Sequence, residues 1–262
     1  MSINLHEQVM PARVTVKSLS FRYRMPDDEE KPVPQVVSDQ QAYAINDISF
    51  SLMAGELLLI AGPSGCGKST LLKCLNGLIP RSYHGTLEGE IRFDGRSTRK
   101  LSLRDLAHYV GTMLQDPDKQ IIGSTVEQEI AFGMENLGTP HDEMLQRIQE
   151  VLQRLHLESY QQRPVHALSG GQRQQVAAAG ILVMRPSIFL FDEPFASLDA
   201  RAVDELETLI ADLRVEGRTV IIVEHRVEEA LRLHPDKVLL MKEGRQTFFG
   251  SVADFLLSYQ EP

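Results

Sequence analysis

The sequence predicts an α/β fold with a β-rich start, a parallel-sheet core, and a helical subdomain inserted between a glycine-rich loop and the later strands. Three observations support this. The runs "SIFLF" and "TVIIVEH" are continuous, apolar and of strand length, as expected for strands buried on both faces of a parallel sheet. Residues 126–157, which precede those runs, have helical periodicity. The strands and helices that follow alternate, as in layered α/β domains.

The first part of the chain is predicted to form mainly strands. Residues 13–23 alternate between apolar and polar side chains and include β-branched residues, which is typical of a strand. Residues 45–62 are predicted to form two more strands around the turn at 54–55. "LEGEIRFDG" is another short strand, closed by Asp94-Gly95. Residues 25–41 contain three prolines and four consecutive acids, so we expect an exposed, mobile loop there.

Helices dominate the middle of the chain. Within "DEMLQRIQEVLQRLHL" the apolar side chains share one helical face: Met144, Ile148, Val151, Leu152 and Leu155. "GGQRQQVAAAGILVM" is also helical. An amphipathic helix over about 202–215 separates the two buried strands, a hairpin-like piece follows at 237–250, and a short helix follows at 251–259.

Composition excludes several classes of function. The net charge of −9 and the scattered basic residues argue against nucleic acid as a partner. Cys66 and Cys74 have no cysteine or histidine nearby to complete a metal site, so neither a disulfide nor a zinc site is expected. No secretion signal is visible at the start, and the longest apolar runs are too short to span a membrane. We therefore expect a cytoplasmic chain of one large domain, or a core with a subdomain.

The stretch "AGPSGCGKST" indicates a nucleotide site. It fits G-x-x-x-x-G-K-[ST] at Gly62, Gly67, Lys68 and Ser69, between an apolar strand and a helix-capable run. The glycines let backbone N–H groups point at phosphate oxygens, Lys68 would neutralise the β- and γ-phosphates, and Ser69 can ligate Mg²⁺. A glycine-rich turn that caps a helix is the alternative, but the strand–loop–helix context favours phosphate binding.

Two further patterns are candidates for binding a cation or an anion. "SIFLFDEP" places Asp192 and Glu193 at the end of a buried strand, where one carboxylate can hold Mg²⁺ and the other can activate water. Taken alone, Asp-Glu-Pro is more often a turn. "LSGGQ" opens a helix that Ser169 can cap, which makes a second anion site or a plain helix cap. One nucleotide has only one triphosphate, so a second anion site in the same chain needs an explanation.

Six motifs, in order, resemble those of the ATP-binding-cassette (ABC) ATPases. They are "GPSGCGKST", the glutamine of "GTMLQDPDKQ", "LSGGQRQQ", "FLFDEP", "ASLD" and "VEHR". The resemblance covers nearly the whole chain, from residue 14 to about residue 250. The resemblance implies one ABC-type P-loop domain (1–262) with an antiparallel β subdomain, a RecA-like core and an inserted helical subdomain. Residues 13–115 would hold the β subdomain and phosphate loop, 116–180 the helical subdomain, and 181–262 the rest of the core and a short tail. It also implies a head-to-tail dimer in which the serine-glycine loop of one chain closes on the ATP of the other.

The resemblance implies ATP and Mg²⁺ as cofactors and a role for each matching residue. Glu193 would be the general base, His225 the switch histidine at the γ-phosphate, and Gln115 the link from Mg²⁺ and the attacking water to the helical subdomain. Ser69, Gln115 and Asp192 would hold Mg²⁺. Tyr23 would stack on adenine, unless it is only a strand-end tyrosine. The remaining nucleotide contacts would be Gly62, Ser64, Gly65, Cys66, Gly67, Lys68, Ser69 and Thr70, with Ser169, Gly170, Gly171, Gln172 and Asp199 acting across the dimer.

One branch of the family fits best. "LQDPDKQIIGSTVEQEIAFGMENLG" and "LSGGQRQQVAAAGILVMRP" resemble the ATPases of energy-coupling-factor importers, which drive uptake of vitamins or of cobalt and nickel. This implies transmembrane transporter subunits as partners, with residues 116–123 beside the groove for their coupling helix, and a peripheral location on the cytoplasmic face of the membrane. The dimer would be a homodimer or a heterodimer with a paralogous ABC ATPase. The 25–41 insertion, Glu224 in place of threonine, and Phe195 in place of a small polar residue depart from the family pattern.

Other functions remain alternatives. The chain could serve another class of ABC transporter, or act as a soluble ABC ATPase outside transport. DNA-repair relatives carry long coiled-coil or zinc insertions, whereas this helical insert is short. A GTPase would need an Asn-Lys-x-Asp motif, which the sequence lacks. A non-hydrolysing clamp would have no need of Glu193 and His225.

Overall fold

The computed structural model describes residues 13–24, 43–196 and 200–258. The expected mobile loop at 25–41 and Asp199 lie outside these residues. The described strands form one ten-stranded sheet in the order β5-β4-β1-β2-β10-β9-β3-β8-β7-β6. The strands are β1 (Val14–Tyr23), β2 (Ile45–Leu52), β3 (Leu57–Ala61), β4 (Gly85–Phe93), β5 (Arg96–Ser97), β6 (Val110–Met113), β7 (Ile188–Asp192), β8 (Thr219–Val223), β9 (Lys237–Lys242) and β10 (Arg245–Ser251).

The sheet has a parallel part and an antiparallel part. One part consists of five strands that are parallel to one another, in the order β9, β3, β8, β7 and β6. At the other end, β1 pairs antiparallel with both β2 and β4. The two parts meet where β10, the antiparallel partner of β9, pairs with β2 through Arg245 and Asn46. The predicted α/β class is therefore confirmed.

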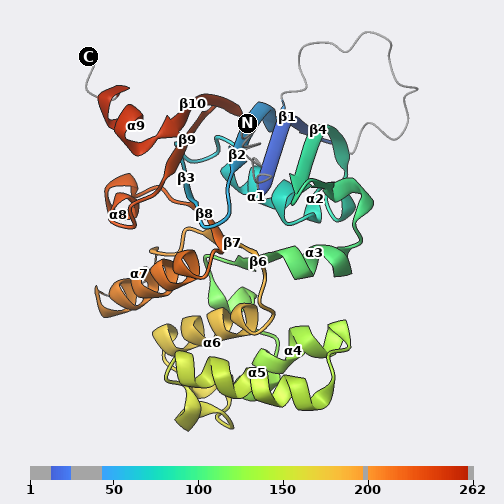
Figure 1. Ribbon diagram of the computed structural model, residues 1–262, viewed down its shortest axis with the longest axis vertical. Coiled ribbons are helices and arrows are strands. Elements are labelled where there is room, and N and C mark those ends of the chain that lie inside the picture. Colours follow the sequence, from blue (N-terminus) through green and yellow to red (C-terminus); the bar gives the residue numbers. More distant parts are fainter. Residues whose placement is uncertain (1–12, 25–42, 197–199, 259–262) are drawn as a thin grey trace, which may run out of the picture.

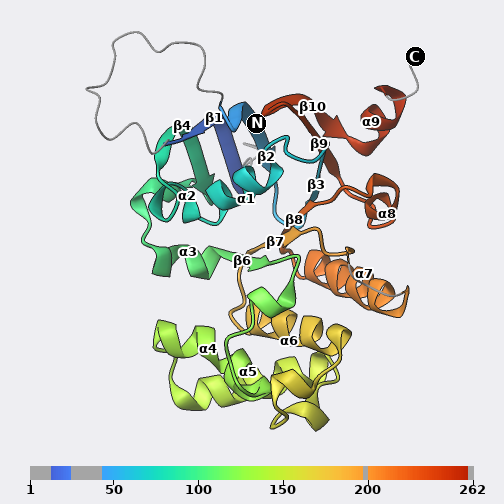
Figure 2. The same ribbon diagram turned by 180° about the vertical axis from the view of Figure 1, so that it is seen from behind.

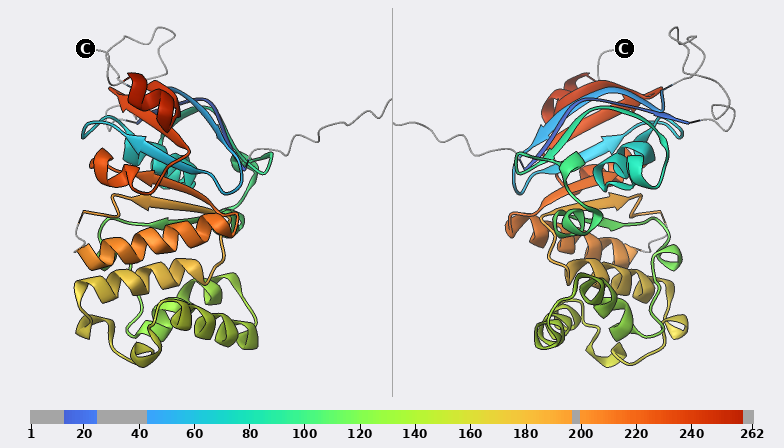
Figure 3. Two further views of the ribbon diagram at one scale, coloured as in Figure 1. Left: turned by 60° about the vertical axis from the view of Figure 1, so that its left-hand side comes forward. Right: turned by 90° about the vertical axis from the view of Figure 1, so that its right-hand side faces the viewer.

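Helices cover the sheet and form a separate group at one end. They are α1 (Lys68–Leu75), α2 (Leu78–Arg81), α3 (Leu103–Tyr109), α4 (Val126–Leu137), α5 (His141–Arg154), α6 (Gly170–Leu182), α7 (Ala200–Val215), α8 (Val227–Leu231) and α9 (Val252–Ser258). Figure 1 shows α4, α5 and α6 together at the end of the molecule opposite the antiparallel strands. Figure 2 shows the same division from behind, and in Figure 3 the antiparallel strands arch over the teal helices α1 and α2.

The central strand β3 is buried on both faces, as its apolar run predicts. Leu57, Leu59 and Ala61 enter one hydrophobic core, which extends to the helical group. Leu58 and Ile60 enter a second core, which contains α1 and the antiparallel strands. Side chains alternate between the faces of a strand, so each five-residue strand of this kind joins both cores. Full burial of one such leucine contributes roughly 1.5–3 kcal/mol, and this anchors the loop that follows β3.

The sequence prediction was right for the long elements and missed several short ones. The periodicity over 126–157 corresponds to two helices, because Gly138 ends α4 in a left-handed conformation (φ 71°) and Pro140 precedes α5. β6 has only four residues, too few for a periodic signal, and α3 and α8 were also not predicted. Among the described residues, no helix combines the length and apolar character needed to cross a membrane.

Candidate functional site

The candidate site lies at one edge of the parallel sheet. β3, β6, β7 and β8 are parallel, so their carboxyl ends meet at the same edge. The residues that follow these four ends are the glycine-rich loop 62–67, Gln115, Glu193 and His225. The fold therefore brings together four segments, of which the outermost residues, Gly62 and His225, are 163 positions apart in the sequence.

The glycine-rich loop depends on glycine at two positions. Gly62 and Gly67 have φ angles of 147° and 104°. A Cβ on Gly62 would lie 2.2 Å from the carbonyl oxygen of Met241, and one on Gly67 would lie 2.5 Å from that of Ala44. No side chain other than hydrogen fits there, so the loop can pack against these two carbonyls only with glycine at both positions. The N–H of Gly244 also donates to the Cys66 carbonyl (3.1 Å) and holds the loop against the turn after β9.

Lys68 is drawn into this loop. Its side chain is only 5% exposed, and Nζ donates to the carbonyl oxygens of Gly62 (2.8 Å) and Pro63 (3.0 Å). Nζ also lies 3.5 Å from His225 Nδ1. A buried ammonium group that is held by neutral carbonyls has no carboxylate to compensate its charge in these contacts. It is therefore suited to neutralise an anion in the loop.

Glu193 stands at the centre of the site. Gln115 Nε2 donates to its Oε2 (3.1 Å), and His225 Nε2 lies 2.8 Å from its Oε1. When Nε2–H of His225 donates to Glu193, Nδ1 is free to accept from Lys68. Glu193 has φ 50°, a left-handed conformation that costs roughly 1–3 kcal/mol in a non-glycine residue and is typical of functional positions. Gln115, Glu193, His225 and Lys68 thus form one continuous chain of contacts.

Asp192, next to Glu193, has a buried carboxylate oxygen, Oδ1, without a hydrogen-bond partner. Burial raises the pKa of Asp192 above its usual value and the nearby Glu193 carboxylate raises it further, while Lys73, Lys68 and His225 oppose the shift. No group of three or more His, Cys, Asp or Glu side chains among the described residues could hold a metal alone. Mg²⁺ commonly takes one or two carboxylates plus substrate phosphates, so the Asp192 carboxylate and the Ser69 hydroxyl fit that ion.

Tyr23 lies close to the start of α1. The Tyr23 hydroxyl is 3.2 Å from Thr70 Oγ1, at the start of α1, and its ring packs edge-on against Phe21 with centroids 4.8 Å apart. These contacts bring the end of β1 beside the phosphate loop. Ser64 and Gly65 of the loop and Ser69 of α1 are exposed, whereas the loop residue Cys66 is 3% exposed.

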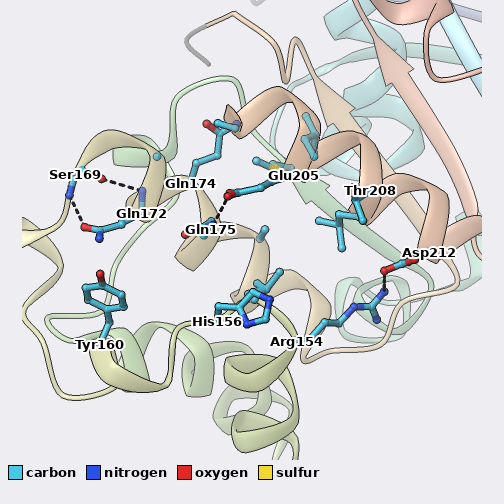
Figure 4. A pocket seen from close by; sticks show the side chains of 17 residues that line it. Arg154, His156, Tyr160, Ser169, Gln172, Gln174, Gln175, Glu205, Thr208 and Asp212 are labelled. Atoms are coloured by element: carbon cyan, nitrogen blue, oxygen red, sulfur yellow. Dashed lines mark hydrogen bonds and ion pairs between the residues drawn. The ribbon is translucent and has the colours of Figure 1, made fainter. Parts of the chain in front are cut away.

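The serine-glycine motif occupies a different place. Ser169 and Gln172 form a reciprocal capping box at the start of α6, so the predicted helix cap is present. A Cβ on Gly170 or Gly171 would meet no atom within 4 Å, so both glycines face open space. The motif borders a cavity of about 540 Å³ between α6 and α7, which none of residues 62–70 lines (Figure 4). The serine-glycine motif is thus separate from the glycine-rich loop of the same chain.

The segment after Gln115 is held at several points. Glu129 Oε2 accepts the N–H groups of Ile122 and Gly123, each at 2.7 Å. Asp118 pairs with Arg173 of α6 at 2.6 Å. Gln120 Oε1 accepts from the Leu114 N–H (2.9 Å), and its Nε2 donates to the Ala177 carbonyl (3.3 Å). The segment is therefore tied to both α4 and α6.

Sequence reasoning missed some of the residues that shape the site. Glu129 and Glu224 are 7% and 2% exposed, and each accepts two consecutive backbone N–H groups. The only signal in the sequence was Glu224 in place of threonine. Phe195, the other departure from the family pattern, is 1% exposed and belongs to the larger hydrophobic core, so packing accounts for it.

The sequence of this chain is similar to those of known proteins. Residues 45–196 match the family model described as "ABC transporter". A Bacillus cereus protein assigned as an ABC transporter ATP-binding protein is 43% identical over 82% of this chain and 38% of its own length. A Streptococcus mutans protein with the same description is 39% identical over 93% of this chain and 41% of its own. The chain spans about two fifths of the length of these curated relatives.

Solved structures give the same result. The structure of cbiO1 from Clostridium perfringens, described as part of the ABC transporter complex cbiONQ, has a TM-score of 0.78 and 31% identity, covering 95% of this chain and 92% of that one. A dimeric ATP-binding cassette, MJ0796, solved in a post-hydrolysis state with ADP and phosphate, has a TM-score of 0.73 and 26% identity. That match covers 91% of this chain and 98% of the other.

Proposed function

The chain belongs to the family of ABC transporter ATP-binding proteins, and from this premise we propose that it hydrolyses ATP to drive an energy-coupling-factor-type importer. The cargo would be a vitamin or a transition-metal ion that crosses the membrane through a partner. One observation carries the ATPase part of the proposal: Gln115, Glu193, His225 and Lys68 form a continuous set of contacts at the mouth of a phosphate loop.

Each group in the site has a proposed task. Lys68 and the N–H groups of the loop bind the β- and γ-phosphates, and Ser69, Gln115 and Asp192 hold Mg²⁺, which offsets charge on the phosphate oxygens when bound. Glu193 accepts the proton of the attacking water, and its contacts with Gln115 and His225 fix the direction of its carboxylate. A positioned base of this kind contributes about 10²–10⁴ in rate.

We propose that two chains complete two sites. The serine-glycine motif at the start of α6 is capped, open to solvent, and separate from the phosphate loop of its own chain. In a head-to-tail dimer, residues Ser169–Gln172 would close on ATP held by the partner chain, and Asp199 would cross the same interface. The dimeric cassette structure to which this chain is similar supports such an assembly.

The membrane partner would dock on the segment after Gln115. Ile122 is 68% exposed, and Leu114 and Phe132 are 38% and 40% exposed. Gln120 accepts the backbone N–H of Leu114 and Glu129 accepts that of Ile122, so these two apolar residues are held in place. The likeness to cbiO1, itself part of an ABC transporter complex, favours the energy-coupling-factor branch.

Co-purification tests this proposal. The chain is tagged in its native host, membranes are solubilised in mild detergent, and associated proteins are identified by mass spectrometry. Small membrane proteins, with or without a second ABC ATPase, are the expected companions, and their identity indicates the cargo. Recovery of soluble proteins or nucleic acid alone would reject the transport assignment and leave the ATPase assignment standing.

A further inference from the structure

Glu224 is a buried carboxylate beside the candidate site. It is 2% exposed and directly follows β8, where its N–H donates to the Ile60 carbonyl of β3 (3.1 Å). Among the described residues, no ion pair joins it to a cation. Charged side chains are almost never buried to this extent without a partner, so this position needs a physical reason.

The side chain of Glu224 accepts hydrogen bonds from the backbone of the next two residues. Its Oε1 atom accepts the backbone N–H of His225 (2.8 Å) and of Arg226 (3.2 Å). Its Oε2 atom is buried and has no hydrogen-bond partner. One oxygen therefore does all the hydrogen bonding, and both of its donors belong to the turn that carries the histidine.

Packing alone does not account for Glu224. An apolar side chain of similar size would fill the same space without the cost of burying a carboxylate. The specific gain from the carboxylate is a fixed geometry for two consecutive N–H groups. Glu129, the other buried carboxylate among the described residues, uses one oxygen in the same way on Ile122 and Gly123.

We propose that Glu224 is a positioning residue for ATP hydrolysis, which acts by holding the backbone of His225 so that its ring stays between Glu193 and Lys68. The inference rests on the proposed function, because it requires a catalytic role for His225. Val223, the residue before Glu224, accepts a hydrogen bond from the Glu193 N–H (2.9 Å). The backbone of Glu193 is therefore held beside the same turn that carries His225.

Three variants separate positioning from packing. Glu224→Met keeps the volume but removes the acceptor, Glu224→Gln keeps the Oε1 acceptor, and Thr219→Val changes a fully buried polar side chain at the opposite end of β8. We expect Glu224→Met to lower kcat by about 10- to 100-fold, as misplacement of a catalytic group does. Glu224→Gln and Thr219→Val should stay within about threefold of wild type, since neither removes that acceptor. The Kd for ATP, measured with a non-hydrolysable analogue, should be similar in all of them.

A double-mutant cycle and hydrogen exchange complete the test. In a His225→Ala background, Glu224→Met should have no further effect on kcat. Amide exchange in the peptide that contains residues 224–231 should accelerate in Glu224→Met and not in Glu224→Gln. If Glu224→Met does not fold, Glu224→Leu replaces it, with the same expectations.

Three results would overturn the inference. The first is wild-type kcat in the apolar variant. The second is a loss of kcat that persists in full when His225 is already alanine, and the third is an equal loss in Thr219→Val. If His225→Ala itself keeps wild-type kcat, the proposed role of His225 falls first, and that result identifies which of the two proposals failed.

Discussion

The Nε2 atom of His225 lies 2.8 Å from Oε1 of Glu193, so the residues that follow β8 and β7 share a close side-chain contact. These residues are 32 positions apart in the sequence, and each follows a buried parallel strand. On one side Glu193 is also held by Gln115, which leads into the segment tied to α4 and α6. The candidate site is therefore connected to the helical group through Gln115.

Gly170→Ala tests whether the serine-glycine motif acts on a second chain. The added Cβ meets no atom within 4 Å, so the free energy of unfolding should change by no more than about 0.5 kcal/mol. ATPase activity should nevertheless fall by about tenfold or more, because the methyl group obstructs close approach to the partner's phosphates. Steady-state phosphate release and thermal unfolding give the two numbers. Unchanged activity would mean that no second chain closes on this motif.

Asp192→Asn tests the pH dependence of stability. The folded-state pKa of Asp192 lies above its ordinary value of 3.8, chiefly because of burial. The stability that protonation confers is full below the ordinary value and is lost as pH rises through the folded-state pKa. We therefore expect Asp192→Asn to raise the Tm at neutral pH and the difference to vanish at acidic pH. It should also weaken Mg²⁺-dependent ATP binding. A variant less stable than wild type at pH 7 would contradict this.

Ile122→Asp tests the docking surface. The side chain is 68% exposed, so the charge should leave folding and basal ATPase activity unchanged but prevent burial against an apolar partner. Recovery of membrane proteins in the tagged pull-down is the measurement. Val215→Asp is the matched control, because Val215 is an exposed apolar residue (89%) at the end of α7. Equal loss of partners in both variants would argue against a surface centred on Ile122.

Phe195→Ala tests whether the departure from the family pattern is a matter of packing. Phe195 is 1% exposed within the larger core, so its truncation should cost about 3–5 kcal/mol of stability. Denaturant unfolding measures this, and the protein that remains folded should bind ATP normally. A loss below about 1 kcal/mol would show that the site relaxes or that the ring contributes little.

How far the sequence predicts this molecule depends on the kind of feature. Continuous apolar runs identified β7 and β8 because both faces of these strands are buried, and the helical period identified α5 and α6. β6 was not predicted, because four residues are too few to show a period. It is nevertheless closely packed: a Cβ on its Gly111 would lie 2.3 Å from the Ile181 side chain.

The candidate site divides in the same way. The phosphate loop and the acidic pair follow from local motifs, since glycine spacing and strand ends are visible in the sequence. The contacts of Glu193 with Gln115 and His225 depend on the order of strands in the sheet, which spacing alone does not contain. The hydrogen bonds that Glu224 accepts from two N–H groups could not be predicted either, because the sequence does not show whether a glutamate is buried or exposed.

ATP turnover by Glu193→Gln tests the central claim most directly. The glutamine keeps the size of the side chain and removes its capacity to accept a proton, so ATP binding should remain close to wild type. Phosphate release should fall by about 10²–10⁴, equivalent to roughly 3–5 kcal/mol of transition-state stabilisation. Near wild-type phosphate release, with ATP binding intact, would contradict the assignment of Glu193 as the base and of this cluster as the hydrolytic site.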